Sequence, residues 1–89
     1  MASYSLRIKK SAIKELEAIS TKADRRRIVQ RIESLAEDPR QPGAQKLSGH
    51  NHYRIRQGRY RILYTVSDRE LVVYVVRIAD RKDAYRNLQ

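Results

Sequence analysis

The sequence contains no cysteine, tryptophan or phenylalanine, and only three glycines and two prolines occur in its 89 residues. The absence of cysteine excludes disulfide frameworks, thiolate zinc sites and cysteine nucleophiles, and it suits a reducing cytosol. No glycine-rich phosphate loop, paired-carboxylate motif or serine-nucleophile context is present. No stretch approaches the roughly 18 consecutive apolar residues of a membrane span, and the N-terminus has no apolar run of signal-peptide length. We therefore expect a soluble, cytoplasmic protein with no membrane partner.

Acidic residues are scarce relative to basic ones. Twenty Lys and Arg oppose ten Asp and Glu, which gives a net charge of +10 and a pI near 10.4. A chain of this length allows one compact domain over residues 1–89. The charge predicts a polyanionic partner, either nucleic acid or an acidic protein. Low hydropathy with high net charge is also typical of disorder, and hydrophobic periodicity distinguishes the two.

The N-terminal half predicts a strand followed by two helices. Apolar and polar residues alternate over residues 4–8, as in a strand with one buried face. Ser11 is the expected cap of a short helix that runs through Ser20. A second helix follows candidate capping residues at 21–24 and ends before Pro39. The expected buried positions are Ile13, Leu16 and Ile19 in the first helix, and Ile28, Val29, Ile32, Leu35 and Ala36 in the second.

The C-terminal half returns to a period of two. Residues 53–56 and 60–66 predict two strands joined by a hairpin at Gly58, and a turn at 67–70 leads to a third, β-branched strand at 71–78. The continuous apolar run in that strand predicts burial on both faces. The order β-α-α-β-β-β indicates a small α+β domain in which a two-helix hairpin packs on one face of a curved, mainly antiparallel four-stranded sheet.

The positive charge is concentrated in two segments that contain no acid. Residues 1–14 and 46–64 together supply nine of the ten excess charges. These charges are Arg7, Lys9, Lys10 and Lys14 in the first segment, and Lys46, Arg54, Arg56, Arg59 and Arg61 in the second. A third basic run, Arg25, Arg26 and Arg27, lies near a helix start, where positive charge opposes the macrodipole. That run is either a solvated surface or a contact for a polyanion.

Three arginines of the predicted hairpin share one sheet face. A loop at 58–59 would place Arg56 opposite Arg61, whereas a loop at 57–58 would place Arg54 opposite Arg61. Both registers keep all three side chains on the same face, because a two-residue shift preserves the alternation. Facing like charges destabilise a sheet, so their retention favours an anion-binding surface. The alternative is an exposed sheet face that uses arginine as its polar residue.

Tyrosine is the only aromatic residue type, with six copies. Tyr53, Tyr60 and Tyr64 share a strand face with isoleucines, which favours core positions over base stacking. Tyr85 lies beyond the last strand, where a single helical turn would bring it to the same side as Arg81. Packing of Tyr85 on the sheet end is the alternative.

Two histidines form the one pattern that suggests a metal. His50 and His52 are separated by a single residue in a turn that has no cysteine and no clear third ligand. That is a weak signal for zinc. We expect no metal and no other cofactor.

Five segments in the C-terminal half carry a family resemblance. Residues 46–49, 53–56, Gly58, 60–64 and 81–86 resemble the RelE/ParE toxin superfamily of bacterial toxin–antitoxin systems, and the resemblance runs over essentially the whole chain. It implies a compact α+β fold and the toxin of a type II system. The superfamily contains RelE-like mRNA interferases, which cut mRNA in the ribosomal A site, and ParE-like toxins, which poison DNA gyrase.

The resemblance favours the RelE branch and implies a catalytic set of Arg54, Arg56, Arg61, Arg81 and Tyr85. These residues match a basic cluster on the central strands and an Arg and a Tyr near the C-terminus. The implied reaction is a metal-independent attack of the RNA 2′-hydroxyl on the adjacent phosphate. The alternatives are a ParE-like gyrase poison and a non-enzymatic nucleic-acid-binding protein.

The same resemblance implies a role for each residue. Arg54 and Arg61 would stabilise the charge on the phosphorane. Arg81 would stabilise or protonate the leaving 5′-oxygen, and Tyr85 would stack on a base or orient the 2′-hydroxyl. Further contacts to RNA or the ribosome are expected from Lys46, Arg59, Arg25, Arg26 and Arg27. The expected partners are an acidic RelB-like antitoxin, a ribosome with mRNA in its A site, and operator DNA through the antitoxin complex alone.

Two positions depart from the family pattern. Where characterised members have a lysine that acts as a base, this chain has Arg56, whose guanidinium does not deprotonate a hydroxyl. Where many relatives have histidine before the C-terminal arginine, this chain has Asp80. Adjacency to Arg81 predicts that Asp80 is ionised and orients the guanidinium. With Asp83 and Tyr85 as the other candidate proton acceptors, we expect no strong general base.

Overall fold

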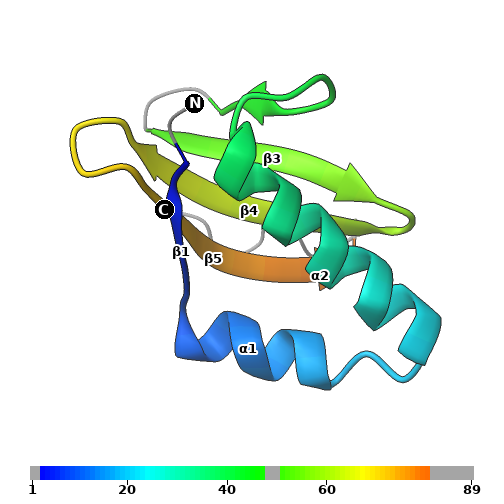
Figure 1. Cartoon of the computed structure of the whole chain (residues 1–89). Helices are drawn as coiled ribbons and strands as arrows, with labels where there is room; N and C mark the ends of the chain where they lie inside the picture. The colour runs from blue at the N-terminus through cyan, green and yellow to red at the C-terminus, as the bar shows by residue number, and fades with distance from the viewer. Residues whose placement is uncertain (1–2, 48–50, 81–89) are drawn as a thin grey trace.

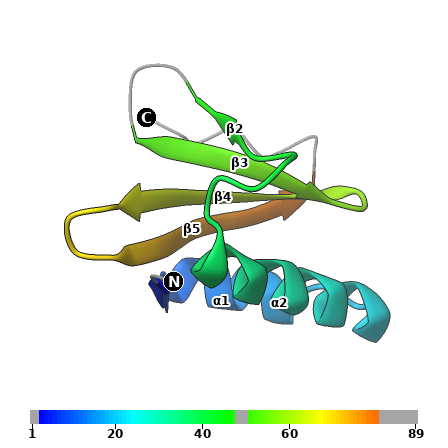
Figure 2. The same ribbon diagram turned by 45° about the horizontal axis from the view of Figure 1, so that its top comes forward.

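The computed structural model describes residues 3–47 and 51–80 and consists of a five-stranded sheet with two helices on one face (Figure 1, Figure 2). The elements are β1 (Ser5–Ile8), α1 (Lys10–Glu17), α2 (Lys22–Glu37), β2 (Gln45–Lys46), β3 (His52–Gln57), β4 (Tyr60–Ser67) and β5 (Val72–Asp80). This confirms the predicted α+β class. Neither helix in the described ranges is long and apolar enough to cross a membrane.

The sheet has the strand order β1-β5-β4-β3-β2. Strands β2 to β5 form an antiparallel meander, and β1 pairs in parallel with β5, from Ser5 opposite Val72 to Ile8 opposite Val75. The sheet is therefore mainly antiparallel, as predicted, but it has five strands instead of four. Strand β2 was missed because two residues are too few to show a period.

The core lies between the helices and the sheet. On β4, Ile62, Tyr64 and Val66 are buried against the helices, while Arg61 and Leu63 alternate onto the other face. Each fully buried aliphatic side chain contributes roughly 1.5–3 kcal/mol relative to exposure. Tyr53 and Tyr64 belong to this core and Tyr60 packs partly against it, which confirms the prediction for these tyrosines. The buried cluster is Ala12, Ile19, Ile28, Ile32, Leu35, Tyr53, Ile55, Ile62, Tyr64, Val66, Val73, Val75 and Ile78.

Strand β5 differs from its prediction. It lies between β1 and β4, but its burial alternates: Val73 is buried while Val72 and Tyr74 on the other face are half-buried. The prediction of burial on both faces was wrong because both helices cover the same face. A bulge in the pairing with β4 breaks the alternation and lets Val75 and Ile78, three residues apart, reach the same core.

The helices also depart from the sequence pattern in detail. Helix α1 begins one residue before Ser11, so Ser11 is not its cap, and it ends at Glu17 instead of Ser20. Ala12 is buried in place of Ile13, which is 39% exposed. Thr21 is the N-cap of α2 but makes no side-chain capping bond. Val29 is exposed, because it lies outside the face of α2 that packs on the sheet.

An ionic network ties the loop after α2 to two distant segments. Arg40 donates from both Nη atoms to the Asp68 carboxylate, at 2.9 and 2.8 Å, and from Nε to the Tyr53 hydroxyl at 3.0 Å. The Tyr4 hydroxyl donates to the same carboxylate at 2.6 Å. The Tyr64 hydroxyl donates to the carbonyl of Pro39 at 2.6 Å, and burial raises the pKa of Tyr64 to about 12.

We predict that Asp68 makes the fold sensitive to acid. Hydrogen bonds from Arg40 and Tyr4 lower the pKa of Asp68 from 3.8 to about 2. A carboxylate with a lowered folded-state pKa stabilises the fold above its unfolded value and loses that contribution as the pH falls through its folded value. Asp68→Asn should therefore unfold at lower urea concentration near neutral pH, and its deficit relative to wild type should shrink between about pH 4 and about pH 2.

The matched control is Glu37→Gln, which removes an exposed carboxylate of α2 that has no bonding partner among the described residues. Its deficit relative to wild type should change little over the same pH range. An Asp68→Asn deficit that is equal at both ends of the range would contradict the assignment.

Candidate nucleic-acid interface

Three arginines of the β3–β4 hairpin lie on the sheet face that the helices leave uncovered, which we call the open face. In the pairing of β3 with β4, Arg56 lies opposite Arg61 and Arg54 opposite Leu63. This is the first of the two predicted registers, with the loop at 58–59. Gly58 has φ +61° and Arg59 does not have a positive φ, a pattern typical of a type II′ turn. The prediction that all three arginines share one face is confirmed.

Arg54 is held in place by strand β2. Its side chain is buried, with 9% of the residue exposed, and its Nη2 donates to the Oε1 of Gln45, its cross-strand partner. Its buried Nε has no hydrogen-bond acceptor among the described residues. Leaving a buried donor unsatisfied costs about 1–3 kcal/mol, more for a charged group. Gln45 was not predicted from the sequence, because the two-residue strand that carries it is too short to show a periodicity.

Arg56 and Arg61 bring like charges together. Directly opposite residues of an antiparallel pair have Cβ atoms about 4.5–5.5 Å apart. Arg56 is exposed and has no ion pair within the described part of the chain, and Arg61 is half-buried. Strands β2, β3 and β4 contain no Asp or Glu at all. No carboxylate from these three strands therefore offsets the positive charge on this part of the open face.

Arg59 sits at the tip of the same hairpin but has a carboxylate partner. Its Nη2 lies 2.5 Å and its Nε 2.8 Å from Oδ2 of Asp80, and its guanidinium lies 5.9 Å from the centroid of the Tyr60 ring. The hydrogen bond to Asp80 raises the pKa of Arg59. Asp80 is the cross-strand partner of Tyr60, on the helix side of the sheet and away from Arg61. It therefore orients Arg59, and its predicted pairing with Arg81 lies outside the described residues.

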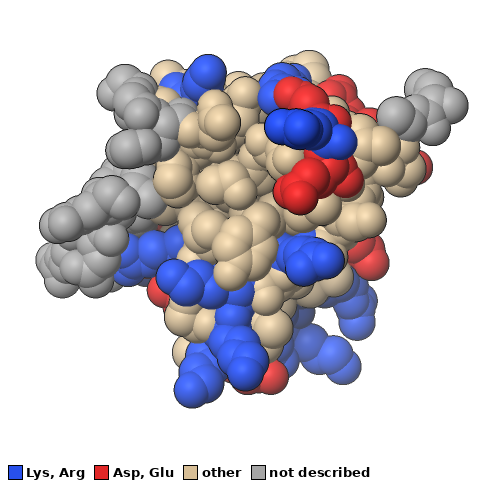
Figure 3. Space-filling model, turned by 90° about the vertical axis from the view of Figure 1, so that its left-hand side faces the viewer, with Lys and Arg blue, Asp and Glu red and all other residues tan. Residues whose placement is uncertain are grey.

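The basic run on α2 is not part of the open face. Arg25 donates to the carbonyl of Ile19, Arg27 lies 3.8 Å from Asp24, and Arg26 is exposed. Both helices lie on one side of the sheet (Figure 2), and the strand register places the hairpin arginines on the other. Figure 3 shows further Lys and Arg side chains gathered in the lower part of the view, with some Asp and Glu side chains among them and others near the top.

The remaining predicted residues divide into two groups. Lys46 is exposed on β2, next to Gln45. His50, Arg81, Asp83 and Tyr85 lie outside the described residues. Among the residues that the structure describes, no group of three or more His, Cys, Asp or Glu side chains is close enough to hold a metal ion.

His52 also lies on the open face, although the sequence suggested it only as a possible metal ligand. It is the cross-strand partner of Thr65 and precedes Arg54 by two residues, so it shares the open face with the arginines. It is half-buried. The sequence signal that would have identified it is the alternation of β3, extended one residue toward the N-terminus. The open face thus combines fixed cations with one imidazole, a set able to bind phosphate and accept a proton.

Comparison with known proteins identifies relatives of the chain. Residues 6–85 match the model of a family described as the ParE toxin of the type II toxin–antitoxin system parDE. No curated protein sequence matches significantly.

Solved structures give a second line of comparison. The chain is 30% identical to a protein of the archaeal RelE–RelB complex from Pyrococcus horikoshii OT3, with a TM-score of 0.79 over 92% of this chain and 99% of that one. It is 27% identical to the isolated E. coli RelE toxin, with a TM-score of 0.76 over 88% and 84% of the two chains. It is 28% identical to a protein of the RelB–RelE complex from Methanococcus jannaschii, with a TM-score of 0.73 over 93% and 99%. The chain belongs to the RelE/ParE superfamily of toxins from type II toxin–antitoxin systems.

Proposed function

We propose that this toxin is a ribosome-dependent endoribonuclease that cleaves mRNA in the A site and thereby inhibits translation. The observation that carries the proposal is the cluster of Arg54, Arg56 and Arg61 on the open face, carried by strands β3 and β4, whose sequences contain no Asp or Glu. Such a surface fits a phosphate backbone, because arginine forks bind phosphate oxygens and facing like charges are relieved by an anion between them. An activity on ribosomes would place the protein in the cytoplasm.

The reaction we propose is attack of an RNA 2′-hydroxyl on the adjacent phosphorus. The bond from phosphorus to the 5′-oxygen breaks, leaving a 2′,3′-cyclic phosphate and a 5′-hydroxyl. Arg54 and Arg61 would stabilise the charge that develops on the phosphorane oxygens. Gln45 fixes the Arg54 guanidinium in advance, and a phosphate oxygen would supply the acceptor that its Nε does not find among the residues described. Arg81 and Tyr85 keep their proposed roles at the leaving oxygen and at a base or the 2′-hydroxyl.

The proton acceptor is the weakest element of this chemistry. Arg56 offers a guanidinium, which has donors but no acceptor, and Asp80 lies on the other side of the sheet, bound to Arg59. His52 adds an imidazole to the open face, two residues along β3 from Arg54. With limited help from acids and bases, much of the rate would come from the ribosome, which positions the RNA for in-line attack.

We further propose an acidic antitoxin as the direct partner. The archaeal relative from Pyrococcus horikoshii was solved as part of a RelE–RelB complex. A disordered acidic segment of a RelB-like protein would wrap this domain, neutralise its basic surface and fold as it binds. Operator DNA would be bound only through that complex. Apolar anchoring on the helices is the alternative source of affinity, and exposed Ile13 and Val29 are available for it.

A ParE-like gyrase poison is the second candidate, because the matching family model describes ParE toxins. The two functions differ in their target and in their chemistry. A gyrase poison damages DNA and needs no arginine cluster arranged around a scissile phosphate. A third possibility, a non-enzymatic nucleic-acid-binding protein, would leave both mRNA and DNA intact.

The first prediction from this proposal concerns mRNA. Expression of the wild-type chain should produce new, in-frame 5′ ends on translated messages. Arg61→Ala and Arg81→Ala should each reduce cleavage by about 10²–10³-fold, the scale of losing a donor that stabilises transition-state charge. Mapping of mRNA 5′ ends measures both. Arg69→Ala, which removes an exposed arginine from the β4–β5 turn, is the control and should cleave normally.

Two results would count against the endoribonuclease. DNA damage with intact mRNA would point to gyrase. Full cleavage by both arginine variants would mean that these arginines are only polar residues of an exposed surface and take no part in cleavage.

The second prediction concerns the missing base. Arg56→Lys should keep or raise activity, because the facing charge of Arg61 favours the neutral form of a lysine at this position, whereas arginine stays charged. Asp80→Ala should lose less than about 10²-fold, the usual minimum for removal of a general base. His52→Gln serves as the comparison on the open face. Single-turnover cleavage on programmed ribosomes measures all three, and a larger loss in Asp80→Ala would identify Asp80 as the base.

The third prediction concerns the antitoxin. Its affinity should be nanomolar or tighter at low salt and should fall as salt rises, because the basic surface attracts an acidic partner. Calorimetric titration of the purified pair over a series of salt concentrations measures this. An affinity that does not change with salt would mean that apolar anchoring on the helices dominates.

A further inference from the structure

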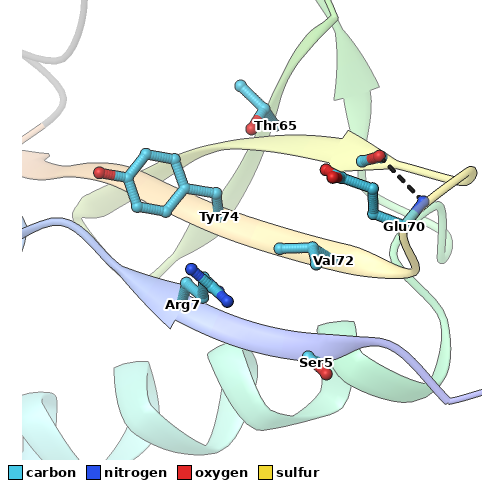
Figure 4. A pocket seen from close by; sticks show the side chains of 7 residues that line it. Ser5, Arg7, Thr65, Glu70, Val72 and Tyr74 are labelled. Carbon is cyan, nitrogen blue, oxygen red and sulfur yellow. Dashed lines mark hydrogen bonds between the residues drawn. The ribbon is translucent and has the colours of Figure 1, made fainter.

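A cavity lies on the open face, away from the hairpin arginines. It has a volume of about 680 Å³ and is formed where β1, β5 and β4 run side by side, with Arg7, Val72, Tyr74 and Thr65 in its lining. Glu70, in the turn between β4 and β5, closes one end (Figure 4). A hollow of this size is within the range of small-ligand sites.

The strand register places this cavity on the same surface as the arginine cluster. Arg7 lies opposite Tyr74, Tyr74 opposite Thr65, and Thr65 opposite His52, so these four residues form one row across the sheet. Along β4, Thr65 is four residues from Arg61 with Leu63 between them on the same face. At about 3.3 Å per residue, this separation is roughly 13 Å. A single RNA strand that lies on Arg61 can therefore continue into the cavity.

Three side chains of the cavity, Arg7, Glu70 and Tyr74, make no polar contact with the rest of the described structure. Within the described ranges, the Arg7 guanidinium and the Glu70 carboxylate form no ion pair, and the Tyr74 hydroxyl forms no hydrogen bond. Of the other lining groups, Ser67 Oγ accepts a hydrogen bond from the Glu70 amide at 3.2 Å, and this bond leaves the Glu70 carboxylate unused. Other arginines of this protein, such as Arg40 and Arg77, are bound to carboxylates. The cavity therefore holds a cation, a carboxylate and an aromatic ring that a ligand can engage.

The arrangement of these groups indicates one ligand chemistry. Figure 4 shows Arg7 and Tyr74 on one side of Val72 and Glu70 on the other. The Arg7 end attracts a phosphate, whereas the Glu70 end repels it. An aromatic ring beside a valine offers a flat apolar surface to a base. A carboxylate accepts hydrogen bonds and donates none, so it selects a base with two adjacent donors, and guanine carries these as N1–H and N2–H₂.

We propose that this cavity is a subsite for a guanine nucleotide of the same RNA strand, outside the scissile pair. Tyr74 and Val72 contact the base, Glu70 accepts from its donor edge, and Arg7 binds the phosphate. The inference rests on the proposed function, since it assumes that RNA lies on the open face. It adds a second point of attachment and a source of sequence preference that the arginine cluster, which contacts the backbone, does not provide.

The test is direct binding of short RNA. Fluorescence anisotropy at low salt compares labelled heptauridylate with the same heptamer carrying one central guanine. Wild type should bind the guanine heptamer about tenfold more tightly, as one bidentate base contact provides. Glu70→Gln should remove most of that preference without weakening heptauridylate. Tyr74→Ala should weaken both heptamers about tenfold, the scale of one stacked base, and Tyr74→Phe should bind as wild type.

Arg7→Ala and Arg69→Ala form a matched pair, because each removes one exposed positive charge but only Arg7 lines the cavity. Arg7→Ala should weaken both heptamers and Arg69→Ala should not. Equal affinity of wild type for the two heptamers, or an unchanged guanine preference in Glu70→Gln, would overturn the inference. Displacement of the label by free GMP as efficiently as by the guanine heptamer would also overturn it, since the ligand would then be a free nucleotide.

RNA binding and mRNA cleavage, measured on the same variants, separate this inference from the proposed function. Loss of RNA binding in Arg61→Ala, together with no guanine preference in wild type, overturns the subsite and leaves the arginine cluster as the RNA contact. A guanine preference that depends on Glu70, in a protein whose Arg61→Ala variant still cleaves mRNA normally, supports the subsite and overturns the catalytic assignment.

Discussion

The pairing of β3 with β4 is the interaction on which the arrangement of the molecule depends. A two-residue turn at 58–59 places Arg56 opposite Arg61, and the alternation of the strands then directs Ile55 and Ile62 into the core. A slip of one residue would bury the arginines and expose the isoleucines, so the apolar core and the basic surface stabilise the same register. The fold that buries the core thus also sets the geometry of the open face.

Two groups of arginines in this protein differ in their partners. Arg40, Arg59 and Arg77 are each bound to a carboxylate and connect distant elements of the fold. In the described part of the chain, Arg7 and Arg56 have no such carboxylate. The first group stabilises the structure, and the second is available to a ligand. Every member of both groups is an arginine with one positive charge. The net charge of the sequence therefore does not distinguish the two groups.

The sequence predicted much of this architecture. The period of two in β3 and β4 fixed the shared face of the arginines, and the 3.6-residue period located both helices. The sequence did not predict the side-chain partners of the arginines, because these depend on contacts between distant segments. Gln45 meets Arg54 only through a two-residue strand, and Asp80 meets Arg59 across the hairpin tip. It also did not predict the cavity, which joins β1 to β5, elements more than 60 residues apart.

The central claim is that the open face cleaves RNA through the 2′-hydroxyl of the substrate itself. The most direct measurement is single-turnover cleavage on ribosomes programmed with an mRNA that carries one 2′-deoxynucleotide at the mapped cleavage position. We predict that this substitution abolishes cleavage at that site, and that the unmodified message leaves a 2′,3′-cyclic phosphate and a 5′-hydroxyl. Cleavage of the deoxy message at an undiminished rate, or products that end in a 3′-hydroxyl, would contradict the proposal.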